Sequence, residues 1–179
     1  MTLIGFWLRK TMEKVLNGMW VGGDTDYNKI KDRPEFYALR CCKDGPGGHK
    51  ETLGYNTRSA PKGPDYLAVV SGRRMALNYI DNDDPNYIPE EMIKKGLRYI
   101  DEQLKAGHKI LVACNAGHSR GPTMAMLYMR SIGELPYNFA QGQRIFHGLY
   151  SHYDPDIGVH TFAKQHWGMF ENWIRGING

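Results

Sequence analysis

The chain has 179 residues, which is enough to bury the core of one domain, so we expect a single domain over residues 1–179. Its formal net charge of +4 suits an anionic substrate but is too small to make nucleic acid an expected partner. No apolar run reaches the length of a membrane span, so we expect no membrane-embedded segment.

The first half of the chain is dominated by strand patterns. Short apolar or alternating runs predict strands at 19–22, which we place at a sheet edge, and at 36–42, 66–70 and 75–80. Between them, residues 44–64 form a long loop rich in glycine, proline and lysine. A loop of this length in a compact domain is usually functional or mobile.

The second half is dominated by helix patterns. A helix is predicted to open at Pro89, with acidic residues in its first turn, and to end at Gly107. A strand at 109–114 and a helix from Thr123 follow, and further helices are predicted at 138–149 and 158–177, the last with a buried aromatic stripe. Strands early and helices late predict an α/β fold.

The most informative segment lies between the strand at 109–114 and the helix that follows it. Cys114 opens this loop and Arg120 closes it, with five residues between them. Gly117 allows the backbone to turn its amides inward, and the next helix contributes its positive N-terminal end. Such a loop binds a tetrahedral oxyanion and also favours a thiolate. The pattern predicts a cysteine nucleophile aimed at phosphorus.

Each part of the loop has a predicted role. Cys114 is the nucleophile, and the planar guanidinium of Arg120 grips two phosphate oxygens. The backbone donors that bind the substrate phosphate are Asn115, Ala116, Gly117, His118, Ser119 and Arg120. The general acid should be a carboxyl group near the loop, and Asp81, Asp83 and Asp84 all qualify by type. No histidine, cysteine or acid cluster has metal-ligand spacing, so we expect no metal and no other cofactor.

The run Cys114-Asn-Ala-Gly-His-Ser-Arg120 resembles the signature loop of the cysteine-dependent protein tyrosine phosphatases, and most of all that of the compact dual-specificity phosphatases. The resemblance covers roughly residues 20–173. It implies a compact dual-specificity-phosphatase-like domain with a central, mostly parallel sheet flanked by helices. It also favours Asp81 as the general acid, with Asp83 as the alternative.

The sequence departs from that family at two positions beside the loop. Ala113 replaces the usual histidine before the nucleophile, and Gly121 replaces the usual serine or threonine after the arginine. In the family these side chains hold the thiolate and assist phosphoenzyme breakdown. We therefore expect slow breakdown of the phosphocysteine, which Gly121→Ser would accelerate, unless Ser119 or Thr123 already supplies the hydroxyl.

The predicted function is hydrolysis of phosphomonoesters, on phosphotyrosine or phosphoserine in proteins. Two alternatives remain open. One is a pseudophosphatase that binds phosphorylated partners without hydrolysis, and the other is an RNA 5′-phosphatase, which the modest charge does not favour. Cys41 and Cys42 are adjacent and suggest no disulfide framework, and no secretory signal is visible, so we expect a cytoplasmic protein.

Overall fold

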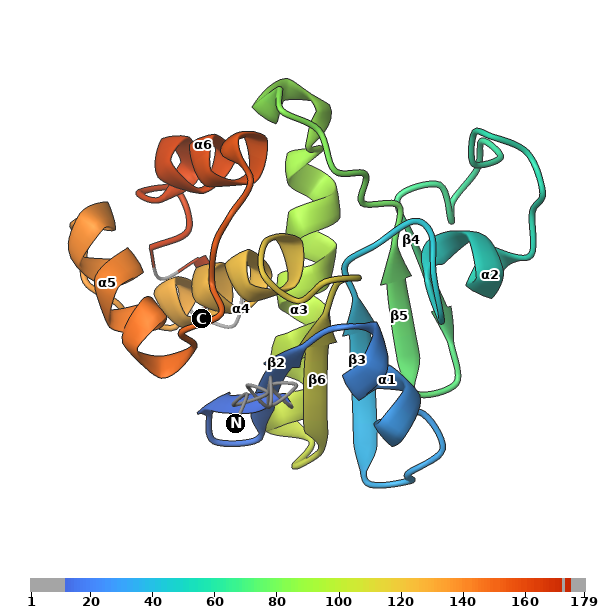
Figure 1. The fold of residues 1–179 in the computed structure, drawn as a ribbon, viewed down its shortest axis with the longest axis horizontal. Helices are drawn as coiled ribbons and strands as arrows, with labels where there is room; N and C mark the ends of the chain where they lie inside the picture. The colour runs from blue at the N-terminus through green and yellow to red at the C-terminus, as the bar shows by residue number, and fades with distance from the viewer. Residues whose placement is uncertain (1–11, 172, 175–179) are drawn as a thin grey trace, which may run out of the picture.

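The computed structural model describes residues 12–171 and 173–174, and in these residues the chain forms a six-stranded mixed sheet with the order β1-β2-β6-β3-β5-β4 (Figure 1). The strands are β1 (Glu13–Leu16), β2 (Met19–Gly22), β3 (Phe36–Arg40), β4 (Ala68–Ser71), β5 (Arg74–Leu77) and β6 (Lys109–Ala113). The four inner strands run parallel, and the edge strands β1 and β4 pair antiparallel with their neighbours. The predicted α/β fold with a mostly parallel sheet is confirmed.

Helices cover both faces of this sheet. They are α1 (Asp24–Ile30), α2 (His49–Leu53), α3 (Glu90–Lys105), α4 (Arg120–Ser131), α5 (Phe139–Leu149) and α6 (Ile157–His166), with a 3-10 turn η1 (Pro85–Tyr87) before α3. Helix α1 packs on one face, whereas α3 and α4 pack on the other, and α4 is in turn contacted by α5 and α6 (Figure 1). No helix in the described residues is long and apolar enough to cross a membrane.

Several predicted boundaries change in the structure. Strand 19–22 is not at an edge, because β1 pairs with its outer side. The pattern of β1 was missed because its four residues include two charges. The predicted loop 44–64 contains the short helix α2. Helix α6 ends at His166, well before the predicted end of the 158–177 helix, and residues 175–177 lie outside the described residues.

The side chains of β6 alternate between the two faces of the sheet, and this alternation decides on which face Cys114, the next residue, lies. Ile110, Val112 and Cys114 belong to the core between the sheet and helices α3 and α4, while Leu111 and Ala113 belong to the smaller core under α1. Cys114 follows β6 directly at the carboxyl edge of the parallel strands. Ligand sites of parallel sheets lie beyond this edge.

Candidate active site

The loop between β6 and α4 folds tightly against the end of β2. Cys114 is 2% exposed at its start. Gly117 lies in the left-handed region with φ +80°, and a Cβ atom there would approach the carbonyl carbon of Gly22 to 2.9 Å. Both the backbone conformation and the lack of space require glycine at this position.

The amide groups of the loop are available for a ligand. Within residues 12–171, the backbone N–H groups from Asn115 to Ser119 donate to no acceptor of the protein. Helix α4 begins at Arg120 and directs its positive end to the same region. Successive unused amide donors before a helix N-terminus are suited to a phosphate-like oxyanion.

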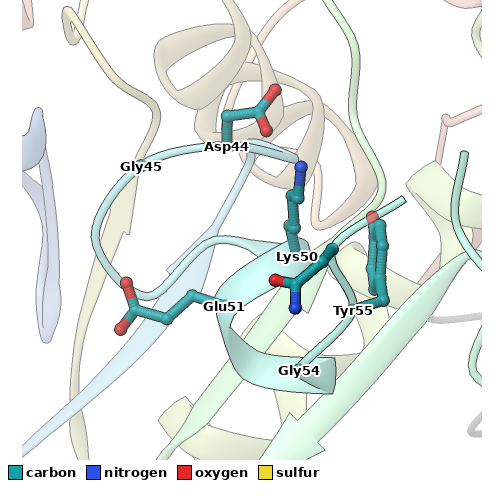
Figure 2. A pocket seen from close by; sticks show the side chains of 7 residues that line it. Asp44, Gly45, Lys50, Glu51, Gly54 and Tyr55 are labelled. Carbon is teal, nitrogen blue, oxygen red and sulfur yellow. The ribbon is translucent and has the colours of Figure 1, made fainter. Parts of the chain in front are cut away.

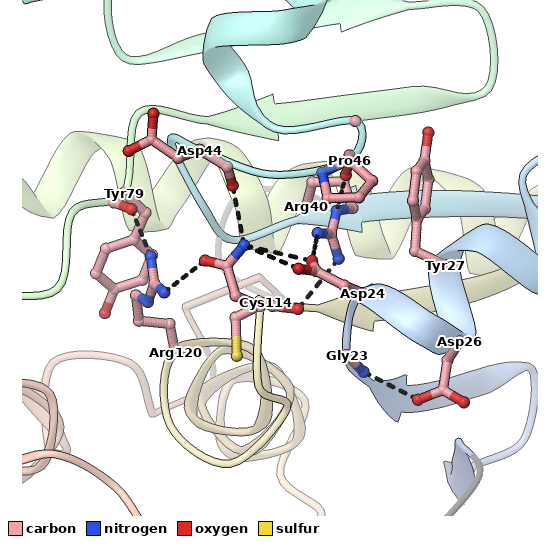
Figure 3. Close-up of polar contacts among 12 residues, drawn as sticks. Gly23, Asp24, Asp26, Tyr27, Arg40, Asp44, Pro46, Tyr79, Cys114 and Arg120 are labelled. Atoms are coloured by element: carbon pink, nitrogen blue, oxygen red, sulfur yellow. Dashed lines mark hydrogen bonds and ion pairs between the residues drawn. The ribbon is translucent and has the colours of Figure 1, made fainter. Parts of the chain in front are cut away.

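The guanidinium of Arg120 is held in a fixed orientation across the loop (Figure 3). Its Nη1 donates to the carbonyl oxygen of Tyr79 at 2.8 Å, and its Nη2 donates to Oδ1 of Asn115 at 2.9 Å. The Tyr79 carbonyl also accepts the backbone N–H of Lys43 at 3.1 Å. Because both anchors are uncharged, Arg120 keeps its full positive charge for a substrate.

Asn115 is itself oriented by two neighbouring loops. Its Nδ2 donates to the backbone carbonyl of Asp44 at 2.9 Å and lies 3.3 Å from both carboxylate oxygens of Asp24. These contacts occupy the amide nitrogen and leave the amide oxygen to accept from the Arg120 guanidinium. The prediction considered only the backbone of Asn115, and this role of its side chain was missed.

A fully buried arginine lies beneath the loop. Arg40, at the end of β3, forms an ion pair with Asp24 and donates to the carbonyl oxygens of Pro46 at 2.9 Å and Cys114 at 3.2 Å (Figure 3). Its guanidinium also lies over the ring of Tyr27, 4.7 Å from the centroid. In the sequence, the feature that could have indicated this buried arginine is a charged residue at the end of an otherwise apolar strand.

Arg40 bears directly on the first family departure. Arg40 and Ala113 are register partners on neighbouring strands, and Ala113 is fully buried on the α1 face. The side chain at 113 thus points to the opposite face from the Cys114 thiol. The small alanine is thus the strand neighbour of Arg40, whose guanidinium donates to the backbone carbonyl of Cys114.

The other side of the loop is held by residues 150–156. Three successive loop residues are bound there: the carbonyl of Gly117 by the Tyr150 hydroxyl at 2.7 Å, His118 by the backbone of Asp154 at 2.8 Å in both directions, and Oγ of Ser119 by the Asp156 N–H at 2.9 Å. The His118 ring is thereby engaged with the protein. These contacts fix the loop before any ligand binds.

Asp81 is an exposed residue close to the loop, with Arg120 and His118 among its neighbours. The pKa of the Asp81 carboxyl is raised, first by loss of surrounding water and then by a hydrogen bond with Asp156. Arg120 and His118 act in the opposite direction and lower this pKa. A raised pKa keeps the proton on this carboxyl to higher pH, as a general acid requires.

The two other acids of this loop have different surroundings. Asp83 is exposed, as Asp81 is, and its backbone lies where the loop meets Gly158 of α6. Asp84 accepts the backbone N–H of Asn86 at 2.9 Å and caps η1. The capping contact is the ordinary turn chemistry of aspartate.

Gly121, the second family departure, has no space for a side chain. A Cβ atom there would lie 2.8 Å from the backbone nitrogen of Cys114 and 3.1 Å from the carbonyl carbon of Ala113. Helix α4 approaches the end of β6 through this glycine. The expectation that Gly121→Ser would accelerate breakdown assumed space for the hydroxyl, whereas in the structure a serine would have to displace the backbone of the loop.

Two further free cysteines lie near the loop. Cys41 and Cys42 are both buried, and burial raises the pKa of Cys42 to about 11 and that of Cys41 well above its ordinary value. Neither thiol is therefore ionised at neutral pH. In the described part of the chain, no group of three histidine, cysteine or acidic residues could hold a metal ion.

The predicted long loop contributes a pocket next to the site. This pocket of about 410 Å³ is lined by Asp44, Lys50, Glu51, Tyr55 and Asn56, with two glycines (Figure 2). Asp44 also binds Asn115 through its carbonyl, so the pocket adjoins the loop. Its mixed charges and single aromatic ring are compatible with a polar substrate segment.

No family model matches this chain, and no curated protein matches its sequence. Several solved structures are similar to it in fold. DUSP15 superposes with a TM-score of 0.68 at 17% identity, covering 94% of this chain and 95% of that protein. The human tyrosine phosphatase-like serine/threonine/tyrosine-interacting protein gives 0.61 at 15% identity, with 90% and 99% covered. PTPMT1 gives 0.59 at 12% identity, with 94% and 99% covered.

These similarities extend over nearly the whole of each chain. At such low sequence identities they show a shared fold and nothing more. They agree with the observed order of elements, in which a mixed sheet carries a strand–loop–helix unit at its centre. The chain therefore has the compact α/β fold of the dual-specificity phosphatases.

Proposed function

We propose that the protein hydrolyses phosphomonoesters through a phosphocysteine on Cys114, with phosphotyrosine or phosphoserine side chains of proteins as substrates. One observation supports this most strongly: the amides from Asn115 to Ser119, directly after Cys114, donate to no acceptor among the described residues, and Tyr79 and Asn115 hold the Arg120 guanidinium at the end of the same loop. An anion held there has its phosphorus close to a sulfur nucleophile.

The reaction has two steps. The Cys114 thiolate attacks phosphorus and forms an S–P bond, while the ester oxygen leaves with the proton of Asp81. Water then attacks the phosphocysteine and gives a proton to the Asp81 carboxylate, and phosphate and thiolate are released. Arg120 and the loop amides stabilise the charge on the phosphoryl oxygens in both steps.

The remaining parts of the proposal follow from this chemistry. The two steps need no metal or other cofactor. The thiol must stay reduced, which fits a cytoplasmic protein, and residues 1–179 would act as one phosphatase-like domain. Phosphorylated proteins are the partners in this proposal.

The direct test is phosphate release from p-nitrophenyl phosphate by the wild type and by Cys114→Ser. Loss of nearly all turnover with retained tungstate binding supports the proposal. Cys42→Ser is the matched control, since it removes a buried thiol near the loop that takes no part in the reaction. If Cys114→Ser turns over as fast as the wild type, the mechanism is wrong.

A second candidate is a phosphate-binding pseudophosphatase. It is favoured by Ala113 and Gly121, since the structure leaves no space for a hydroxyl at 121. One similar structure is that of the human tyrosine phosphatase-like serine/threonine/tyrosine-interacting protein. Binding of a phosphotyrosine peptide by the wild type without phosphate release would favour this candidate. Release of phosphate from RNA 5′ ends, but not from phosphopeptides, would favour the RNA alternative.

A further inference from the structure

A second carboxyl group faces the general acid from a distant part of the chain. Asp156 stands at the N-cap of α6, where an aspartate ordinarily accepts an N–H of its own helix. Here its side chain makes no capping hydrogen bond, and its interaction with Asp81 contributes to the raised pKa of that carboxyl. Two carboxyl groups can share a hydrogen bond only if one of them carries a proton.

The backbone around Asp156 keeps the two carboxyls together. The Asp156 N–H donates to Oγ of Ser119 at 2.9 Å, which ties the start of α6 to the anion-binding loop. Two residues later, Gly158 packs directly against the backbone carbonyl of Asn82, and no Cβ atom would fit there. The acid loop, the anion-binding loop and α6 therefore meet at one point.

The groups around Asp81 favour a proton on that carboxyl. Asp81 faces Asp156 at the N-cap of the ten-residue helix α6, and Arg120 and His118 on the anion-binding loop. Loss of water and the negative charge of Asp156 favour the protonated form of Asp81.

We propose that Asp156 is a positioning residue that shares one proton with Asp81 and keeps Asp81 protonated to a higher pH than a lone aspartate. This inference rests on the proposed function. When the P–O bond breaks, the shared proton goes to the leaving oxygen, and two facing carboxylates remain. Their repulsion favours uptake of a proton from the water that attacks the phosphocysteine, which restores the pair.

The kinetic test compares the pH dependence of kcat for the wild type and Asp156→Asn. With phenyl phosphate, whose leaving group needs a proton, the basic limb of the profile should move to lower pH in Asp156→Asn. With p-nitrophenyl phosphate the change should be small, and KM should stay nearly constant. Asp154→Asn is the control, because it removes an exposed carboxylate two residues away and keeps the backbone contacts to His118.

A second measurement does not need activity. The carboxyl carbon of Asp81, assigned by its loss in Asp81→Asn, is titrated by NMR in the wild type and in Asp156→Asn. The proposal requires a titration midpoint above that of a free aspartate in the wild type and a lower midpoint in Asp156→Asn.

Equal midpoints in the two proteins overturn the proposal, as does a basic limb that does not move. A protein that releases no phosphate but shows the shifted midpoint would refute the proposed function and leave the carboxyl pair established. Failure of one proposal is thus distinguishable from failure of the other.

Discussion

Replacing Arg40 by methionine tests the role of the buried cation under the loop. Arg40→Met keeps an apolar stem but removes the guanidinium and every hydrogen bond that it makes. The carbonyl oxygens of Pro46 and Cys114 lose this donor, and the Asp24 carboxylate keeps only its contact with Asn115. The cost therefore comes from polar groups that lose a partner, together with the lost packing of the guanidinium on Tyr27.

The magnitude follows from the burial of the pair. The Arg40 side chain is 0% exposed and that of Asp24 is 32% exposed, so water reaches one partner only. Removing one member of a buried ion pair costs about 3–5 kcal/mol of folding free energy. Because water reaches Asp24, we expect a loss of about 3 kcal/mol, at the lower end of this range. This is a large share of a typical stability of about 5–15 kcal/mol.

Urea unfolding followed by circular dichroism measures this loss, and p-nitrophenyl phosphate turnover measures the effect on the loop. A shift of about 1 Å in the Cys114 backbone should lower turnover roughly 10²-fold. Arg33→Met is the control, since Arg33 pairs with Glu35 at the surface and should cost at most about 1 kcal/mol. An Arg40→Met variant as stable as the Arg33→Met control would refute the reasoning.

Three further outcomes are expected. Gly121→Ala should lower stability by about 1–3 kcal/mol and reduce tungstate affinity, because its Cβ atom would overlap the backbone of Cys114; unchanged values would contradict the close packing. Arg120→Lys should weaken tungstate binding in a calorimetric titration, since an ammonium cannot span Tyr79 and Asn115. Asp81→Asn should slow phenyl phosphate more than p-nitrophenyl phosphate, and the same pattern in Asp83→Asn instead would move the acid to Asp83.

The raised pKa of Asp81 also sets a pH dependence of stability. The folded state binds the Asp81 proton more tightly than the unfolded state, so its contribution is greatest at acidic pH and is lost as the pH rises through the folded pKa. Asp81→Asn should therefore be more stable than the wild type at mildly alkaline pH and equal to it at acidic pH, as measured by urea unfolding. Equal stability at both would contradict the linkage.

The sequence by itself determined the features that depend on neighbouring residues. The apolar run before Cys114, the glycine at 117 and the start of a helix near Arg120 together predicted the strand–loop–helix unit found as β6, the loop and α4. The helix opening at Pro89 and ending at Gly107 was predicted by the same kind of signal. Local geometry alone requires these residue types, which is why single segments reveal them.

Only the tertiary structure decided how distant segments complete the site. The order of strands makes Arg40 and Ala113 partners, and the return of the chain to α6 sets Asp156 against Asp81. It also leaves no space for a side chain at Gly121. No local pattern encodes these contacts, because a hydrogen bond or a steric overlap depends on which backbones the completed packing brings together.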